Sequence, residues 1–326
     1  MTARPDFQCE STPASVNVRI ACSFNDAYAP HFATLAASLA AACGAETLQI
    51  TIIVGPGLGS DTIRALEAYL RTLNLSLECV RVSDVALLGL PPSGAYPPLI
   101  WYRLLLPELL PDVSRVIYLD TDTLVLHSLL PLFQTDLGTD LMAAVASPTT
   151  GWEDHCRSVG VDPDRGYFNS GVLLMNLDQM RRENFTAHAL QVAKISGDTL
   201  VFPDQDLLNL VAQGRWKKLH PKWNAISYLW LDAQGADHAY SALEYTVAAH
   251  SPAIVHFEGP ISVKPWYFRC LHPLRGVYRQ LRAQTPWPLT ELEGRSWLAL
   301  LLRPLPLKWQ YRITRTRLRI SGWLRS

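Results

Sequence analysis

The sequence lacks the marks of several large classes of protein. Its six cysteines form no CxxC pair and follow no regular spacing, so a disulfide framework is not expected. No uninterrupted apolar stretch is long enough to cross a bilayer. The first 15 residues are polar and rich in Pro, Ser and Thr, which is not the pattern of a signal peptide. These absences predict a cytoplasmic protein with reduced thiols and a flexible segment over residues 1–15.

Acidic residues are missing from the C-terminal end. All 29 Asp and Glu residues precede position 294, whereas eight of the 29 Lys and Arg residues follow it. The tail therefore carries a charge of +8, and the body, with 21 basic against 29 acidic residues, carries −8. The net charge of zero hides two parts that face different surroundings.

What is present is a large apolar fraction with alternating periodicities. At 326 residues and 48% hydrophobic residues, the chain can bury a large core, and no internal repeat is evident. Apolar runs typical of buried strands alternate with helical patterns, Ser60 being a plausible cap of the second helix. The strands are expected at 16–24, 47–54, 75–82 and 113–119, and the helices at 29–43, 60–73 and 100–110. This order predicts an α/β fold with a doubly wound, mostly parallel sheet, whose ligands bind at the carboxyl ends of the strands.

The second half of the chain continues the pattern and then loses it. Further strands are expected at 141–146, 171–177 and 252–257, and helices at 178–195 and 204–213. After Leu271, Pro, Trp and basic residues accumulate. We therefore expect a main domain over 16–270 and a small basic helical extension over 271–326.

Two aspartates follow the strand at 113–119. Asp120 and Asp122 stand one residue apart in VIYLDTDTLV, and carboxylates beside a buried strand are costly unless a positive group pairs with them. They suggest a divalent cation with oxygen ligands. The motif resembles the DxDxT nucleophile motif of haloacid dehalogenase-type phosphatases and, equally, the DxD metal motif of nucleotide-sugar glycosyltransferases. Three strand and helix units precede it and no later acidic pair completes a phosphatase site, which favours the second interpretation.

Four further motifs extend that resemblance. In order along the chain they are WYRLLLPELLP (101–111), YFNSGVLLMNL (167–177), PDQDLLN (203–209) and IVHFEGPISVKPW (254–266). With the DxD motif they resemble glycosyltransferase family 8, a retaining family with a GT-A type fold, and especially its bacterial lipopolysaccharide α-galactosyl- and glucosyltransferases. The resemblance covers roughly residues 16–270. It implies transfer of a hexose, galactose or glucose, from a UDP-sugar to a saccharide acceptor.

The resemblance also assigns roles at the leaving group. It implies that Asp120, Asp122 and His256 bind a metal, and two carboxylates with one imidazole suit Mn²⁺, with Mg²⁺ as the alternative. The metal would act as a Lewis acid on the departing nucleoside diphosphate. Lys264 would place a charge on the same phosphates, and Gly259 would let the backbone approach them.

The remaining site residues implied by the resemblance contact the donor and the acceptor. Tyr28 would stack on uracil, and Arg103 would reach the sugar or the diphosphate. Gln205 is an amide, a poor nucleophile, so front-face attack is our hypothesis for retention, with Asp204 beside it. The donor-binding set is Asn25, Asp26, Tyr28, Arg103, Asp120, Thr121, Asn169, Gly259 and Lys264, and the catalytic set is Asp122, Asp204 and Gln205.

Three departures from the family pattern affect specificity. Asn25 replaces a carboxylate near uracil, and Ser147 stands where related galactosyltransferases often have Asp. The segment from Gly259 to Lys264 is two residues longer than the GPxKPW form. Taken alone, His256 is better explained as a core histidine, and an Arg such as Arg103 on an amphipathic helix is often only solvated; the place of His256 before FEGP and KPW favours the metal role.

The tail predicts a site of action. From Leu305 to Leu324 an apolar stripe that includes Trp309 and Trp323 runs beside a basic face. Such a helix would lie on an anionic membrane, each basic residue contributing about 1 kcal/mol, whereas an acidic body argues against nucleic acid. We expect an enzyme bound peripherally at the cytoplasmic face, acting on lipopolysaccharide or another lipid-linked glycan. A phosphatase and a non-catalytic nucleotide-sugar-binding protein are the alternatives.

Overall fold

The structure, a computed structural model, describes residues 17–44, 46–82, 90, 97–147, 153–231, 239–296, 300 and 309. The expected flexible segment over 1–15 and, Trp309 apart, the expected tail helix lie outside these residues. Within them, no helix is long and apolar enough to cross a membrane.

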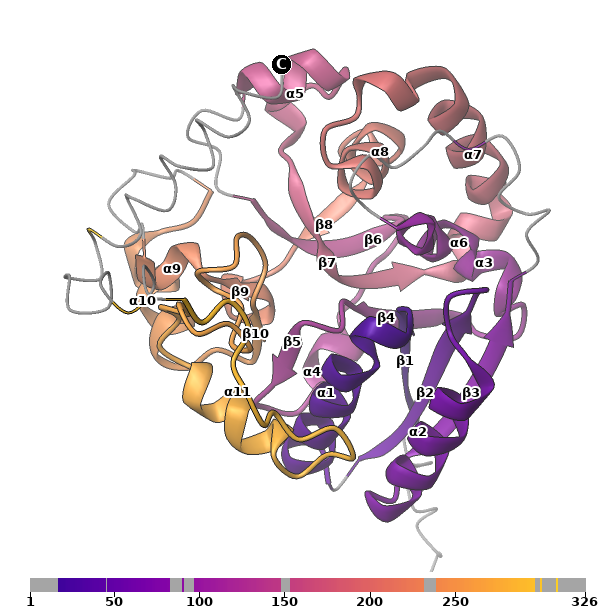
Figure 1. The fold of residues 1–326 in the computed structure, drawn as a ribbon. Helices are drawn as coiled ribbons and strands as arrows, with labels where there is room; N and C mark the ends of the chain where they lie inside the picture. The colour runs from indigo at the N-terminus through magenta and orange to yellow at the C-terminus, as the bar shows by residue number, and fades with distance from the viewer. Residues whose placement is uncertain are drawn as a thin grey trace, which may run out of the picture.

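A seven-stranded sheet forms the centre of the molecule (Figure 1). Its strands lie in the order β3-β2-β1-β4-β7-β6-β8. The pairs β3-β2, β2-β1, β1-β4 and β6-β8 are parallel, while β7 runs antiparallel to both β4 and β6. The predicted α/β fold with a mostly parallel sheet is confirmed. The strands are β1 Asn17–Ser23, β2 Thr47–Val54, β3 Ser76–Arg81, β4 Arg115–Leu119, β6 Met142–Ala146, β7 Phe168–Asn176 and β8 Trp216–Lys218.

Both faces of this sheet are covered at its centre, which explains why its inner strands are apolar runs rather than alternating ones, whereas the edge strands β3 and β8 are partly exposed. Along β2, Ile50 and Ile52 pack with α1 (Ala29–Ala42) and α2 (Ser60–Thr72), whereas Ile53 points to the opposite layer. That layer contains α3 (Leu106–Leu109), α6 (Leu177–Arg182), α7 (Phe185–Ser196) and α8 (Pro203–Ala212).

Three local predictions were wrong in detail. The stretch 100–110 is a 3₁₀ helix, Pro98–Leu105, followed directly by the single turn α3, and Pro107 lies in the first turn of α3, where its missing N–H is tolerated. The helix expected at 178–195 is broken into α6 and α7 at Asn184, whose φ is +51°, a conformation that Asn tolerates. Gly59, not Ser60, is the N-cap of α2, and the Gly59 amide donates to Asp26 Oδ1 at 3.0 Å.

A second, three-stranded sheet was not predicted as a unit. In it, β10 (Ile254–His256) lies between β5 (Thr123–Val125), to which it is antiparallel, and β9 (Ala225–Ile226), to which it is parallel. His256 pairs with Thr123, and the Phe257 amide donates to the Asp122 carbonyl at 2.9 Å. This small sheet therefore carries His256 to the two aspartates. The remaining helices are α4 Leu130–Phe133, α5 Glu153–Val159, α9 Tyr228–Leu231, α10 Ala242–His250 and α11 Arg275–Arg282.

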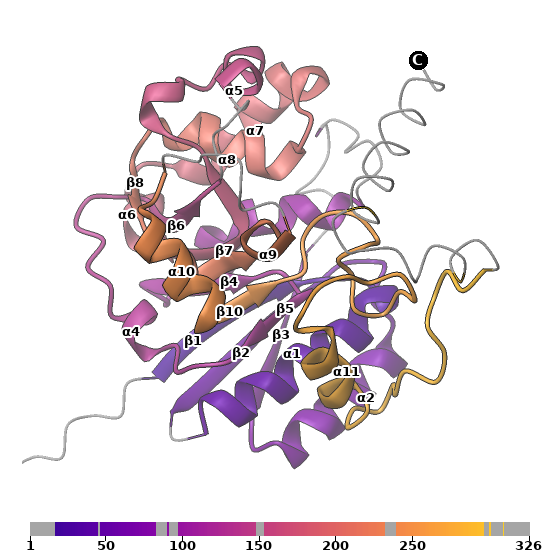
Figure 2. The same ribbon diagram turned by 90° about the vertical axis from the view of Figure 1, so that its left-hand side faces the viewer.

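Part of the expected C-terminal extension is packed on the body. Figures 1 and 2 both show α11 beside α1. Tyr278 of α11 is fully buried with Phe257 and Trp266, and the Phe268 amide donates to the Glu293 carbonyl at 2.8 Å. Residues 271–293 therefore share a core with the small sheet.

Candidate active site

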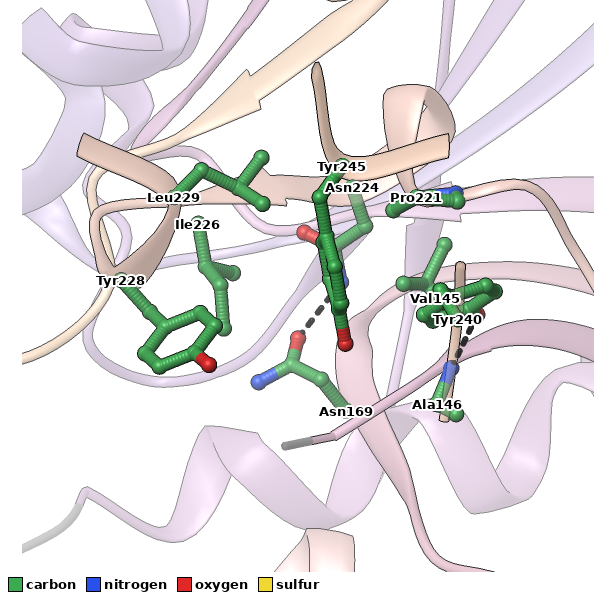
Figure 3. A pocket seen from close by; sticks show the side chains of 10 residues that line it. All are labelled: Val145, Ala146, Asn169, Pro221, Asn224, Ile226, Tyr228, Leu229, Tyr240 and Tyr245. Atoms are coloured by element: carbon green, nitrogen blue, oxygen red, sulfur yellow. Dashed lines mark hydrogen bonds between the residues drawn. The ribbon is translucent and has the colours of Figure 1, made fainter. Parts of the chain in front are cut away.

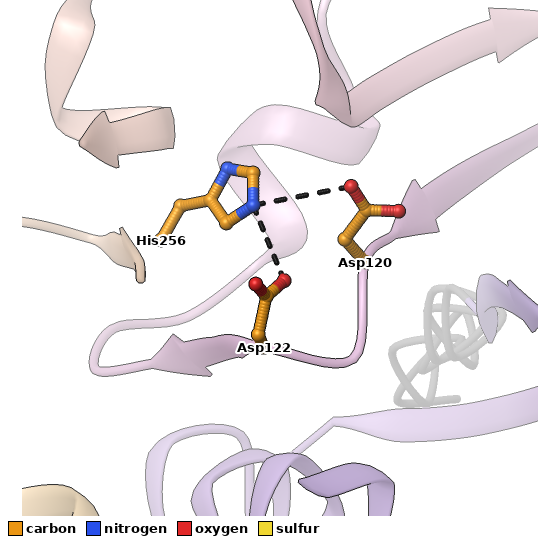
Figure 4. A group of neighbouring side chains, drawn as sticks. All are labelled: Asp120, Asp122 and His256. Carbon is orange, nitrogen blue, oxygen red and sulfur yellow. Dashed lines mark ion pairs between the residues drawn. The ribbon is translucent and has the colours of Figure 1, made fainter. Parts of the chain in front are cut away.

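Asp120 and Asp122 meet His256 at the carboxyl end of β4 (Figure 4). His256 Nε2 lies 3.2 Å from Asp122 Oδ1 and 3.9 Å from Asp120 Oδ2. One ligand atom from each residue fits within a span of 4.8 Å. A cluster of two carboxylate oxygens and one imidazole nitrogen is a donor set suited to Mn²⁺. Three residues that the sequence predicted as metal ligands are thus brought together.

Gly171 makes room for this cluster. A Cβ on Gly171 would lie 2.1 Å from His256 Cε1 and 2.9 Å from Asp120 Oδ2, so any other residue would displace both side chains. The Asp120 amide donates to the Gly171 carbonyl at 2.8 Å, which fixes the two backbones. The sequence prediction missed Gly171, although a glycine inside an apolar strand marks a close approach.

Opposite charges explain how this cluster tolerates burial. Lys264 Nζ contacts Asp122 Oδ2 at 2.5 Å. Burial favours the neutral acid, but the charges of Lys264 and His256 outweigh it and hold the pKa of Asp122 well below its usual range. Burial likewise opposes the imidazolium form, yet Asp122 and Asp120 raise the pKa of His256 above its ordinary value. Lys264 therefore reaches the cluster despite its longer loop.

Asn224 orients His256 and was also missed. Asn224 Oδ1 lies 3.0 Å from His256 Nδ1, and Asn224 Nδ2 donates to Asn169 Oδ1 at 2.7 Å. A hydrogen bond of this kind selects which imidazole nitrogen faces a metal. Asn224 lies at the end of the 3₁₀ helix Pro221–Asn224 and is 1% exposed. No motif in its sequence neighbourhood indicated this role.

Arg103 bridges the carboxylates of Asp120 and Asp204 on the side of the site that faces the main sheet. Its two terminal nitrogens lie 2.9 Å from Asp120 Oδ1 and 2.9 Å from Asp204 Oδ2, and its guanidinium stacks 4.3 Å from the Tyr118 ring. With 3% exposure it is not a solvated helix residue. Burial raises the pKa of Asp204, and the Arg103 charge opposes that shift. Ser170 Oγ donates to Asp204 Oδ2 at 2.9 Å.

Among the residues that the structure describes, Gln205 is held by neutral groups. Its Oε1 accepts from Asn169 Nδ2 at 3.0 Å and from the Ser170 amide at 3.2 Å, while its Nε2 donates to the Tyr167 hydroxyl at 3.1 Å. Tyr167 in turn donates to the buried carboxylate of Asp206. Both acceptor positions of the Gln205 oxygen are therefore occupied.

The predicted nucleotide residues lie at the start of α1. Tyr28 is 41% exposed, which leaves its ring available for stacking. Asn25 and Asp26 make local contacts: Asn25 Oδ1 accepts from the Tyr28 amide at 3.3 Å, and Asp26 accepts from the loop before α2. Thr121 is buried between the aspartates, and Gly259 has a φ of +101°, which favours glycine.

A pocket adjoins the site at Asn169 and Asn224, next to His256 (Figure 3). Asn169 and Asn224 form one wall, hydrogen-bonded to each other, and aliphatic and tyrosine side chains form the others. The Tyr240 hydroxyl accepts from the Ala146 amide at 2.8 Å and donates to the Leu219 carbonyl at 2.7 Å, so it is satisfied within the protein. The pocket therefore offers mainly apolar and aromatic surface.

The chain is similar in sequence and fold to known glycosyltransferases. The sequence model of the protein family described as Glycosyl transferase family 8 matches residues 19–270 of this chain. General stress protein A of Bacillus subtilis (strain 168) is 28% identical over 272 residues, 82% of this chain and 93% of the relative. Lipopolysaccharide 1,2-glucosyltransferase of Escherichia coli (strain K12) is 25% identical over 65% of this chain and 62% of that enzyme. The crystal structure of the galactosyltransferase LgtC with donor and acceptor sugar analogs superimposes with a TM-score of 0.72, at 25% identity, over 83% of this chain and 96% of that one.

Proposed function

The chain belongs to glycosyltransferase family 8, and on that premise we propose that it transfers galactose or glucose from a UDP-sugar to a saccharide acceptor with retention of configuration. The observation that carries the proposal is the convergence of Asp120, Asp122, His256 and Lys264 at one strand end. Relatives named as lipopolysaccharide glucosyl- and galactosyltransferases support synthesis of lipopolysaccharide or another cell-surface glycan as the process.

The residues present fit a divalent cation. Asp120, Asp122 and His256 would hold it, and the space left by Gly171 keeps their ligand atoms free of steric conflict. When bound, the cation would supply Lewis-acid stabilisation of the departing diphosphate. We propose Mn²⁺, because an imidazole with two carboxylates suits it better than Mg²⁺.

Lys264 acts beside this cluster in the proposal. Its ammonium, at the end of a flexible side chain, pairs with Asp122. Once the donor phosphates bind, it would form an ion pair with them instead. Stabilising the charge that develops on the leaving group lowers the barrier to breaking its bond with the hexose. Tyr28, exposed at the start of α1, would stack on the base.

Asp204 and Gln205 face the hexose in the proposal, from the first turn of α8. Asp204, neutralised in part by Arg103, would accept hydrogen bonds from hexose hydroxyls. The Gln205 oxygen already accepts two hydrogen bonds, so its lone pairs are not directed at an anomeric carbon. This supports front-face attack by the acceptor, without a glycosyl-enzyme intermediate.

A phosphatase is the weaker alternative. Its nucleophile would be Asp120, yet Asp120 Oδ1 is paired with Arg103 and the family match covers the whole catalytic region.

Incubation of the protein with Mn²⁺ and a panel of UDP-hexoses tests the proposal. We expect slow release of UDP without an acceptor and a product of retained anomeric configuration with one. Phosphate release from phosphomonoesters would indicate the phosphatase, and UDP-hexose binding without any turnover would indicate a binding protein.

Attachment to an anionic membrane is a separate part of the proposal. Residues 295–326 carry the eight basic residues that follow the last acidic one. Deleting 295–326 should release the protein from vesicles that contain anionic lipids and leave its turnover of soluble acceptors within about twofold. The deletion retains residues 271–293, which pack on the body. Unchanged partition into vesicles would refute the anchor.

A further inference from the structure

A buried polar cluster joins α11 to the start of α1. The Tyr278 hydroxyl lies 2.5 Å from His31 Nδ1, and an Arg282 terminal nitrogen lies 3.3 Å from the Tyr278 oxygen and 3.5 Å from His31 Nδ1. His31 and Arg282 are each 7% exposed and Tyr278 is fully buried. These three side chains belong neither to the strands of the sheet nor to the proposed metal ligands.

The cluster selects one form of the His31 ring. Arg282 can only donate, so it donates to the Tyr278 oxygen, and the Tyr278 proton points to His31 Nδ1. His31 Nδ1 is then the acceptor and Nε2 carries the hydrogen. Burial, reinforced by the Arg282 charge, lowers the pKa of His31 to about 3, so the ring is neutral at physiological pH.

The His31 ring touches two elements of the donor site at once. Its centroid lies 3.9 Å from that of Trp266 and 5.0 Å from that of Tyr28. Lys264 Nζ stands 5.6 Å above the Trp266 ring while it contacts Asp122. The base-stacking tyrosine and the lysine that would bind phosphate are therefore linked through one imidazole.

We propose that His31, held by Tyr278 and Arg282 of α11, is a positioning residue that sets the distance between Tyr28 and the Trp266–Lys264 segment. These two elements would contact opposite ends of a nucleoside diphosphate, the base and the phosphates, so their separation decides how well the donor fits. The inference rests on the proposed function. It makes α11 a support of donor binding rather than part of a membrane tail.

The test uses the full-length protein with Tyr278→Phe, which removes the hydroxyl and keeps the ring that packs on Trp266 and Phe257. We expect the Kd for UDP with Mn²⁺ and the KM for UDP-hexose to rise about tenfold, because the buried hydrogen bonds of this hydroxyl to His31 and Arg282 are lost. The kcat and the KM for the acceptor should stay within about twofold. Arg282→Lys, which keeps the charge but not the planar fork, should give the same pattern more weakly.

Val277→Ala is the matched control, because Val277 neighbours Tyr278 on α11 but is 37% exposed; its UDP affinity should equal that of the wild type. If the substitution only disturbed the structure in general, kcat would fall and the KM values for UDP-hexose and for the acceptor would both rise. That result would overturn the inference. So would an unchanged UDP affinity in Tyr278→Phe when the wild type binds UDP. A wild-type protein that binds no UDP would overturn the proposed function and the inference with it.

Discussion

The two ends of the site are built from different chemistry. At the metal end, Asp122 and His256 are buried and Asp120 and Lys264 are half-buried, and opposite charges within about 4 Å offset the cost of burying charge there. At the amide end, Asn169, Asn224 and Gln205 are neutral and satisfied by hydrogen bonds. The first end can exchange one positive partner for another, whereas the second has no charge to exchange. This difference suits the first end to bind a cation and phosphates, and the second to hold a sugar in a fixed position.

Removing one charge from the metal end should have the largest effect. In Asp122→Asn the carboxylate that pairs with both Lys264 and His256 becomes neutral, and the proposed metal site loses one of its charged ligands. We expect kcat/KM for UDP-hexose to fall by roughly 10²- to 10³-fold, with weaker Mn²⁺ binding by titration calorimetry. Asp112→Asn, an exposed carboxylate before the opposite end of β4, is the control. Activity and Mn²⁺ affinity equal to those of the wild type would contradict the metal assignment.

Filling the space beside the metal end tests its geometry without changing its charge. Gly171→Ala places a methyl group against His256 and Asp120, so both ligands must move. We expect Mn²⁺ affinity and activity to fall about 10- to 100-fold, the range found when the support of a metal ligand is disturbed. Gly276→Ala in α11 is the matched control, because a Cβ there meets no atom within 4 Å. Equal activity in the two variants would show that the cluster is not held as the structure has it.

The two ends also differ in how far the sequence predicted them. The pair Asp120 and Asp122 was predictable, because a buried strand that delivers two carboxylates to its end is a local pattern. His256 was assigned through the family motif, and β5 and β9, the strands beside it, were missed because they are two or three residues long. Nothing local to Asn224 indicates that it orients His256 across 32 positions of sequence. Long-range partners of this kind depend on the fold rather than on a pattern.

The layers of the fold show the same limit. Six of the seven strands of the main sheet were predicted, most of them because strands buried on both faces are continuous apolar runs, whereas β8 was missed because it is three residues long and partly exposed. The break at Asn184 was not predicted, since a helical pattern continues through that position and only the backbone angle ends α6 there, and neither was the 3₁₀ conformation of Pro98–Leu105. The packing of Tyr278 on α1 was hidden by the basic residues that surround it in sequence.

A substitution at the amide end should lower activity less than one at the metal end, and we expect no covalent hexosyl-enzyme intermediate. Gln205→Ala removes hydrogen bonds to Asn169, Ser170 and Tyr167 but no charge, so we expect kcat to fall about tenfold. Intact-mass spectrometry after rapid quenching should detect no hexosyl adduct in either protein. Gln134→Ala at the exposed end of α4 is the control. A trapped adduct in the wild type that disappears in Gln205→Ala would refute front-face attack.

The last effect is on stability rather than on activity: a histidine outside both ends shows by contrast what the charges at the metal end do. His256 and His272 are both buried, but carboxylates raise the pKa of His256, whereas burial, with Arg275 adding to it, lowers the pKa of His272 to about 3. Below pH 6.5 the unfolded chain protonates residue 272 and the native protein does not, so native stability falls as pH drops from about 6.5 toward 3. Between pH 7 and pH 5 this histidine should cost about 2 kcal/mol of the free energy of unfolding.

His272→Asn should remove that dependence, because Asn does not titrate and its side chain can still accept from the Leu274 amide as His272 Nδ1 does. Urea unfolding at pH 7, 6 and 5 should therefore show a smaller loss of stability in the variant than in the wild type, by about 2 kcal/mol over the range. His250→Asn, at an exposed histidine, should keep the wild-type slope. The contrary result would be a wild-type dependence of stability on pH in His272→Asn as well. The pKa of His272 would then not be lowered by its burial without a carboxylate partner, and the contrast with His256 would lose its physical basis.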